Sequence, residues 1–246
     1  MCVKAVSSSL VDTGVSSNSS QMVLNPYDAY ALERAIEIAK QFQDNRVICL
    51  CMGPPSASHV LTRCIAMGAD EAIHLCDNRF AGADTYSTVL TLSKAIERLN
   101  YDLIVCGKKS VDGETGQVIG GLAARLQLNC LAGVSELKVC GDKWIVTYTE
   151  DTTIHIVETV SPLIISFNDF SLHSMMNLIA LKRAKAEAIS VWDAKFLGLE
   201  ATECGYQGSK TLIHNTSSKI RTENKNITFI REGVELFLIE QIKKYK

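Results

Sequence analysis

The stretch of this sequence with the clearest chemical potential is CGKKSVDGETGQVIGG, at residues 106–121. It joins the apolar run LIVC, at residues 103–106, to the helix-like stretch VIGGLAARLQL. A glycine-containing loop between a strand and a helix presents free backbone N–H groups beside the positive end of the helix dipole. Phosphate is the ligand that such an end favours, although similar loops also cap helices without any ligand. The spacing alone leaves both alternatives open.

The elements that must position this loop alternate between strands and helices over the first 130 residues. Short apolar runs predict strands at residues 1–6, 47–52, 71–76 and 102–106. Amphipathic patterns predict helices between them, the first beginning at Asn25 and the third covering residues 85–98. This order is typical of an α/β fold with a doubly wound, mostly parallel, Rossmann-like sheet. Such sheets bind ligands beyond the carboxyl ends of their strands, which is where the 107–117 loop falls.

The pattern changes after Leu131. Alternating apolar and polar residues predict antiparallel strands within residues 137–160, and SPLIISF predicts a further core strand. Residues 194–228 are rich in Gly, Ser and Thr and predict an extended arm. After this arm, the pattern of residues 232–246 predicts an amphipathic helix. We therefore expect a nucleotide-binding α/β domain at residues 1–193 and an arm with a terminal helix at residues 194–246.

Composition narrows the classes of partner. The chain has 246 residues, 47% of them hydrophobic, which is enough to build a globular core. Its net charge is −2 and it has no long basic stripe, so neither nucleic acid nor an anionic membrane surface is favoured. No apolar run approaches the roughly 20 residues that span a bilayer, and no secretory segment opens the sequence. We expect a cytoplasmic protein.

The nine cysteines lie mostly inside apolar runs, where thiols pack as small hydrophobic groups. Cys49 and Cys51 form a C-x-C on a predicted strand, but no second pair with zinc spacing follows. We therefore expect neither a disulfide framework nor a metal site.

Several stretches resemble the beta (small) subunit of electron transfer flavoprotein, a heterodimer that moves electrons between flavoenzymes. They cover most of the chain in the family's order: VKAV, NPYDAYALERAI, CMGPP, CIAMGADEAIHL, FAGADT, DLIVCGKKSVDGETGQV, SPLIIS and NLIALKRAKA. The resemblance implies a nucleotide-binding α/β domain that embraces a larger alpha subunit with its C-terminal arm. It also implies that nucleotide phosphates lie on the loop matching residues 112–118.

By that resemblance, the expected nucleotide contacts come from the strand ends and from this loop. They are Cys2, Asn25, Met52, Asp84, Thr85, Gly107, Asp112, Gly113, Glu114, Thr115, Gly116, Gln117 and Val118. Ordinary packing is the alternative for Cys2 and Met52, and helix capping is the alternative for Asn25.

The loop residues suit this role chemically. Gly113 and Gly116 would let the backbone approach phosphates closely, while Thr115 and Gln117 would supply neutral donors beside the backbone N–H groups. The charge of Asp112 makes it unsuited to phosphate, so we expect it to hold the loop or a ribose hydroxyl.

The resemblance implies either AMP, held structurally, or a second FAD, as in members that bifurcate electrons from NADH. Bifurcating members carry D-G-[DE]-T-x-Q-V and F-A-G-[AS]-D-T, and this chain has both, as VDGETGQV and FAGADT. We therefore expect FAD, with AMP as the alternative. Asp84 and Thr85 have a second compatible role, because they can cap the helix that follows them.

A second site concerns docking of a partner. The family anchors a dehydrogenase through an exposed apolar side chain in the loop after the SPLIIS-type strand, which corresponds here to residues 172–177. The expected docking residues are Leu172, Met175 and Met176, with Met175 at the anchor position. Methionine suits an adaptable contact, and burial in the protein's own core is the alternative.

The resulting expectation is a beta subunit that passes NADH-derived electrons toward a flavin-dependent dehydrogenase of the acyl-CoA type and toward ferredoxin. Flavin carries the redox chemistry, so no catalytic side chains are expected, and no H-E-x-x-H or G-x-G-x-x-G motif occurs. The rival is a beta subunit that holds structural AMP. A stand-alone nucleotide-binding protein is disfavoured, because a long polar arm makes sense chiefly when it wraps another surface.

Overall fold

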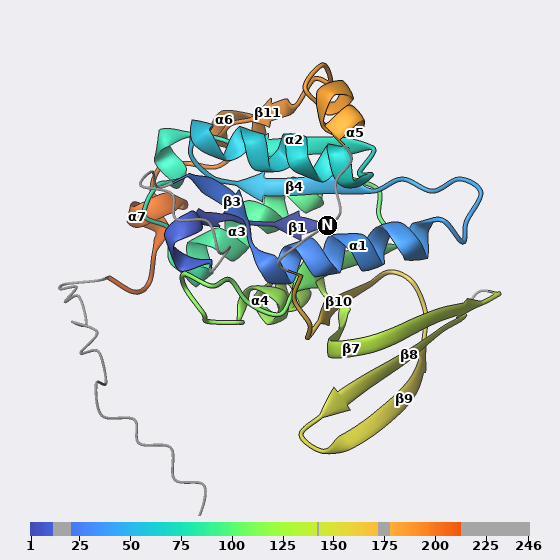
Figure 1. Cartoon of the computed structure of the whole chain (residues 1–246). Helices are drawn as coiled ribbons and strands as arrows, with labels where there is room; N and C mark the ends of the chain where they lie inside the picture. The colour runs from blue at the N-terminus through green and yellow to red at the C-terminus, as the bar shows by residue number, and fades with distance from the viewer. Residues whose placement is uncertain (12–20, 142, 172–177, 213–246) are drawn as a thin grey trace, which may run out of the picture. The chain divides into compact units, whose positions relative to one another are not determined.

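Four parallel strands form the first sheet (Figure 1). Their order is β1 (Cys2–Val3), β4 (Ile48–Met52), β5 (Glu71–Leu75) and β11 (Ser190–Trp192). A short antiparallel hairpin of β2 (Ala5–Ser7) and β3 (Met22–Leu24) follows β1. The computed structural model describes residues 1–11, 21–141, 143–171 and 178–212.

The second sheet is mixed. Its order is β6 (Leu103–Gly107), β10 (Leu163–Phe167), β7 (Asn129–Cys140), β8 (Lys143–Glu150) and β9 (Thr153–Thr159). The first three strands are parallel, whereas β8 and β9 are antiparallel additions that extend from the sheet as a long ribbon (Figure 1). The expected α/β class and the expected antiparallel strands are confirmed.

Helices cover both faces of the parallel strands. They are α1 (Pro26–Ala39), α2 (Ser58–Met67), α3 (Thr85–Ile96), α4 (Val118–Leu126), α5 (Leu178–Ala184), α6 (Ala194–Leu197) and α7 (Gly205–Gly208), with short 3-10 turns at Ser8–Leu10, Pro55–Ala57 and Asn78–Phe80. Side chains alternate along each strand, so Cys49 and Cys51 of β4 pack with α1 and α2 while Leu50 packs with α3 and α4. This alternation sets two separate cores on the two sides of β4.

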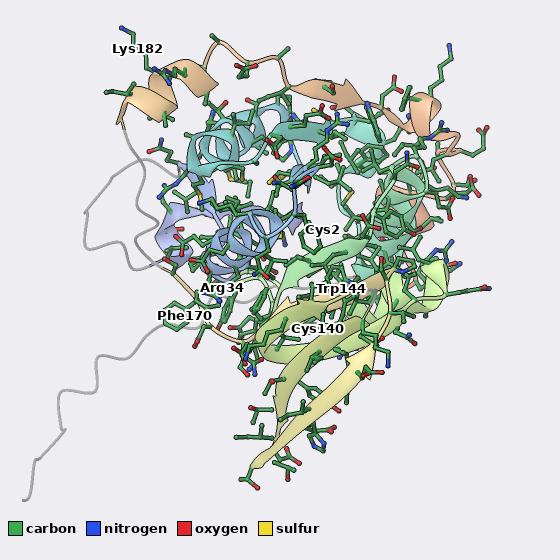
Figure 2. The ribbon with its side chains drawn as sticks, turned by 90° about the vertical axis from the view of Figure 1, so that its right-hand side faces the viewer. Cys2, Arg34, Cys140, Trp144, Phe170 and Lys182 are labelled. Atoms are coloured by element: carbon green, nitrogen blue, oxygen red, sulfur yellow. The ribbon has the colours of Figure 1, made fainter. Side chains whose placement is uncertain are left out.

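The antiparallel ribbon is held to the rest by aromatic packing under α1. Trp144 of β8 is buried with Ala35 and Ile38 of α1, and its ring stacks on Phe42 at a centroid distance of 6.1 Å (Figure 2). Stacking of this kind adds to the burial of apolar area. The ribbon therefore has a defined attachment to the helix that also carries the N-terminal part of the site.

Residues 190–212 pack against the parallel strands. β11 pairs with β5, and Asp77 and Asp84 hold the segment by accepting hydrogen bonds from the backbone N–H groups of Ala194 at 3.0 Å and Lys210 at 2.8 Å. The compact unit that these contacts complete ends at Leu212. Residues 194–212, the first part of the expected arm, thus belong to this unit.

Two sequence-based expectations lie outside the described residues. They are the docking loop with Leu172, Met175 and Met176 and the terminal helix of residues 232–246. In the part of the chain that the structure describes, no helix is long and apolar enough to cross a membrane.

Candidate functional site

The two sheets meet where β1 lies beside β6. The chain continues from β1 to β4 and β5 on one side, while β6 and β10 lie on the other, so the strand order turns at this point. Polar loops beyond the carboxyl ends of two such strands form the usual ligand site of α/β sheets. The residues that follow β1 and β6 are therefore the candidates for a ligand site.

Asn25 connects the start of α1 to the loop after β6. The side chain is fully buried, its Nδ2 donates to the carbonyl oxygen of Lys109 at 2.9 Å, and its Oδ1 accepts from the backbone N–H of Val111 at 3.3 Å. Asn25 occupies the N-cap position of α1, but its side chain makes no capping hydrogen bond. The capping alternative for its side chain is therefore wrong, because the amide is used by the loop.

Asp28, which was not among the expected site residues, lies beneath this loop. Its Oδ2 accepts a hydrogen bond of 2.8 Å from the backbone N–H of Lys4 at the end of β1, and the backbone of Gly107 at the end of β6 also donates to the carboxylate. Burial raises the pKa of Asp28 to about 7, although these hydrogen bonds and one from Asn25 act in the opposite direction. One carboxylate thus links two strands that share no backbone ladder.

Gly107 has to be glycine for this contact to form. A Cβ atom there would lie 2.3 Å from Oδ1 of Asp28 and 2.8 Å from the carbonyl carbon of Tyr27. Both distances are far below van der Waals contact. The close approach of helix α1 therefore accounts for a glycine at this position. The expected nucleotide contact of Gly107 stays a prediction.

Two exposed ion pairs shape the loop itself. Lys4 Nζ lies 2.8 Å from Asp112, and Lys109 Nζ lies 3.1 Å from Oε1 of Glu114. Burial would raise the pKa of Asp112, but hydrogen bonds from Lys4 and Ser110 outweigh it and the pKa is lowered. Asp112 thus holds the loop, which is one of the two roles expected for it.

Two residues of the loop before α4 have a left-handed backbone conformation, with positive φ. Gly116 has φ +63°, and Glu114 has φ 52° although it carries a side chain. A non-glycine residue at positive φ is strained, and such strain concentrates at functional sites. Gly113 has no such requirement, because a Cβ there would lie 3.6 Å from Oγ of Ser110. Of these two glycines, only Gly116 is required by the backbone conformation, and the expected close approach of both to phosphate stays a prediction.

Helix α4 begins at Val118 with no side chain capping it. Gln117 occupies the N-cap position, makes no side-chain capping bond, and donates its own backbone N–H to Oγ1 of Thr115 at 3.4 Å. The first N–H groups of a helix have no partner within the helix, so this end is open to an anion. The residues fit a phosphate group in chemistry.

Cys2 is the first residue of β1 and lies beside Cys106 of β6, while Met52 is the last residue of β4. The Cys106 thiol donates a hydrogen bond to the Cys2 sulfur across the β1–β6 junction, which lowers the pKa of Cys2 and raises the pKa of Cys106. Met52 is half-buried at the end of β4 and packs on the core under α3 and α4. The packing alternative accounts for both side chains, and their expected nucleotide contacts stay predictions.

Asp84 is fully used within the chain. Oδ1 caps α3 by accepting from the N–H of Ser87 at 2.9 Å, and Oδ2 accepts from the N–H and hydroxyl of Thr211 at 2.8 Å each. Burial opposes these bonds, yet the pKa of Asp84 is lowered to about 2. The capping alternative for Asp84 is confirmed, and Thr85 is the half-buried first residue of the helix.

The structure therefore connects Asn25 with the loop that follows Gly107 of β6 and contains residues 112–117, whereas Met52 ends β4 and the pair Asp84 and Thr85 lies on a separate loop. Sequence reasoning missed Lys4, Asp28 and Lys109. Asp28 did have a sequence signal, because the helix dipole favours an acidic residue in the first turn of a helix. That signal does not show whether the carboxylate is buried, so it did not mark Asp28 as part of the site.

The geometry defines an α/β protein with a polar loop and an open helix end at the junction of two sheets. A family model described as "Electron transfer flavoprotein domain" matches residues 13–197. The chain belongs to the electron transfer flavoprotein family, and the resemblance to its beta subunits is confirmed.

Relatives named in this family cover most of the chain. An "Electron transfer flavoprotein subunit beta" of Thermoanaerobacterium thermosaccharolyticum is 33% identical over 95% of this chain and 89% of its own length. "Caffeyl-CoA reductase-Etf complex subunit CarD" of Acetobacterium woodii is 34% identical over 80% of this chain and 76% of its own. "Protein FixA" of Azorhizobium caulinodans is 34% identical over 78% of this chain and 71% of its own.

Proposed function

We propose that this chain is the beta subunit of an electron transfer flavoprotein heterodimer and binds FAD on the loop of residues 107–118. With its alpha subunit it passes electrons between NADH, a flavin dehydrogenase of the acyl-CoA type and ferredoxin. The observation that carries the nucleotide site is the uncapped start of α4, which follows a glycine-containing loop beyond the end of β6. The name of one relative, "Caffeyl-CoA reductase-Etf complex subunit CarD", supports a role in an electron-transfer complex.

The flavin supplies the redox chemistry, and this chain supplies position and charge. The N–H groups at the start of α4 would meet the phosphates, with Gly116 in the left-handed conformation that allows the backbone to turn toward them. Lys109 is paired with Glu114, and Lys4 with Asp112, so the two pairs leave no net charge on these four side chains. Phosphate binding would then depend on backbone donors more than on unpaired lysines.

FAD is favoured over AMP by the VDGETGQV loop. The second motif, FAGADT, contributes less than the sequence predicted, because both carboxylate oxygens of Asp84 are occupied by Ser87 and by the segment around Thr211. Structural AMP on the same loop is the alternative, and it would make this subunit a holder of the nucleotide without a second flavin.

Counting nucleotides tests the proposal. The chain is purified with its alpha subunit, bound nucleotides are released with acid, and FAD and AMP are counted per heterodimer by chromatography. Two FAD and no AMP are expected, whereas one FAD with one AMP would establish the alternative. Neither nucleotide beyond the flavin of the alpha subunit would overturn both.

A glycine variant connects the count to the loop. Gly116→Val places a β-branched side chain at φ +63°, so the loop must change shape and nucleotide content should fall. Gly141→Val is the matched control, because Gly141 also has a positive φ of +62°, a Cβ there meets nothing within 4 Å, and the residue lies between β7 and β8. Unchanged nucleotide content in Gly116→Val would remove the loop from the site.

A further inference from the structure

Every hydrogen-bonding atom of the Asn25 side chain is already used inside the protein. Nδ2 donates to the carbonyl oxygen of Lys109 at 2.9 Å and also to the Asp28 carboxylate, while Oδ1 accepts from the N–H of Val111 at 3.3 Å. An amide nitrogen has two donors, so both are used by Lys109 and Asp28. The side chain is fully buried. Asn25 therefore has no donor left for a nucleotide.

The contacts of Asn25 and Asp28 converge on one structure. Asn25 clips the loop at residues 109 and 111, and Asp28, in the first turn of the same helix, fixes the ends of β1 and β6 through the backbone of Lys4 and Gly107. These two side chains from α1 thus determine where the loop leaves the sheet. Buried hydrogen bonds of this kind specify one backbone conformation, because breaking them leaves unpaired groups.

We propose that Asn25 is a positioning residue for nucleotide binding, which acts by fixing the loop backbone at residues 109–111 and makes no contact with the nucleotide. The inference rests on the proposed function of the loop. It changes the role that the family resemblance implies for Asn25, from a nucleotide contact to a support beneath the proposed phosphate loop.

Two substitutions separate these roles. Asn25→Ala removes both loop contacts. Asn25→Asp keeps the shape, but an ionised carboxylate would face the Lys109 carbonyl oxygen and the Asp28 carboxylate, and it would have no donor. When protonated, the new carboxyl regains one donor and one acceptor, so it can restore the acceptor for Val111 and one of the two donor contacts of the amide. Its pKa should be raised by burial and by the charge of Asp28.

The charged groups around this position come from three elements. Lys4 lies at the end of β1, Asp28 lies on α1, and Lys109 and Asp112 lie in the loop. The buried thiols of Cys2 and Cys51 also face Asp28. The pKa of Asp28 is itself about 7, so pH also changes the charge of Asp28 in every variant. Because both Asn25 variants contain Asp28, the ratio of their nucleotide exchange rates is the informative quantity.

The measurement is the rate at which bound nucleotide exchanges with labelled FAD, and separately with labelled AMP, in the complex with the alpha subunit. At about pH 8 both variants should exchange about tenfold faster than the wild type. At about pH 6 Asn25→Asp should return toward the wild-type rate, while Asn25→Ala should not. A ratio between the variants that stays constant with pH would overturn the proposal, as would wild-type exchange in both.

Two further proteins keep the outcomes distinct. Leu61→Ala removes a fully buried side chain on α2, a helix that contributes no residue to the loop or its supports, so it reports general loss of stability and should leave exchange unchanged. Gly116→Val reports the loop itself. If Gly116→Val and the Asn25 variants all exchange like the wild type, the proposed loop function fails; if only Gly116→Val exchanges faster, the role of Asn25 fails alone.

Discussion

At the scale of single residues, Asp28 is a buried carboxylate whose ionisation opposes folding. Its pKa is about 7 in the folded protein, above the ordinary value of 3.8, because burial outweighs the hydrogen bonds that it accepts. The unfolded chain loses this proton at lower pH than the folded chain does. Stability from this group is therefore complete below about pH 4 and is lost as pH rises toward about 7.

Asp28→Asn tests that sign. The variant has no titrating group at this position, so its free energy of unfolding should fall less between about pH 4 and about pH 7 than that of the wild type. The limiting difference is roughly 4 kcal/mol, from about 1.4 kcal/mol per pKa unit. Urea unfolding followed by tryptophan fluorescence at several pH values would measure it. Equal slopes for the two proteins would show that Asp28 is already ionised at low pH in the folded state.

At the scale of elements, the contact between α1 and β6 depends on one missing side chain. Gly107→Ala would place a Cβ against the backbone of Tyr27 and the carboxylate of Asp28, with the nearest atom at 2.3 Å. Because backbone cannot rotate away, α1 must shift, and we expect a loss of at least about 3 kcal/mol in unfolding free energy. The same change at Gly120 should be neutral or stabilise by up to about 1 kcal/mol, since it meets no atom within 4 Å in helix α4. Thermal unfolding of both variants makes the comparison, and equal effects would contradict it.

The segment around Thr211 depends on a carboxylate in the same way. Asp84→Ala removes the cap of α3 and the acceptor for Lys210 and Thr211, so it should destabilise by about 2 kcal/mol and speed trypsin cleavage after Lys210. Thr211→Val removes one of these bonds and should have a smaller effect. Cleavage at the wild-type rate in Asp84→Ala would mean that other contacts hold the segment.

Periodicity and capping signals predicted the helices that begin at Pro26, Ser58, Thr85 and Val118 and the parallel strands between them, because those signals are local. The use of the Asn25 amide could not be predicted this way. Its partners in the loop are 84 and 86 residues away in sequence, and their approach depends on β6 lying next to β1. The packing of residues 194–212 was missed for a similar reason, since it depends on two carboxylates more than 100 residues earlier. The local polarity of residues 194–228 indicated an extended arm. Long-range hydrogen bonds instead hold residues 194–212 in the compact unit of residues 1–212.

At the scale of the whole molecule, residues 1–212 form a unit with its own hydrophobic cores on both sides of the parallel strands. Buried apolar area of this kind is the main source of folding free energy. We therefore propose that the unit folds without residues 213–246, and that the contact with the alpha subunit depends on the part of the arm beyond Leu212.

A chain ending at Leu212 tests this division of roles. The truncated protein should keep the helical circular dichroism signal of the described unit and a similar unfolding temperature, because residues 1–212 form a compact unit with three hydrophobic core clusters of their own. It should bind the alpha subunit at least about tenfold more weakly in size-exclusion and calorimetric assays, since an arm that wraps a partner contributes much of the buried interface. Full binding by the truncated chain would assign the interface to the unit itself, and loss of folding would assign residues 213–246 to its core. If the truncated chain binds the alpha subunit fully, substitutions on the exposed surface of α6 and α7 would test that surface as the interface. Phe196 is the first residue to substitute, because its ring is half exposed beneath the guanidinium of Arg98.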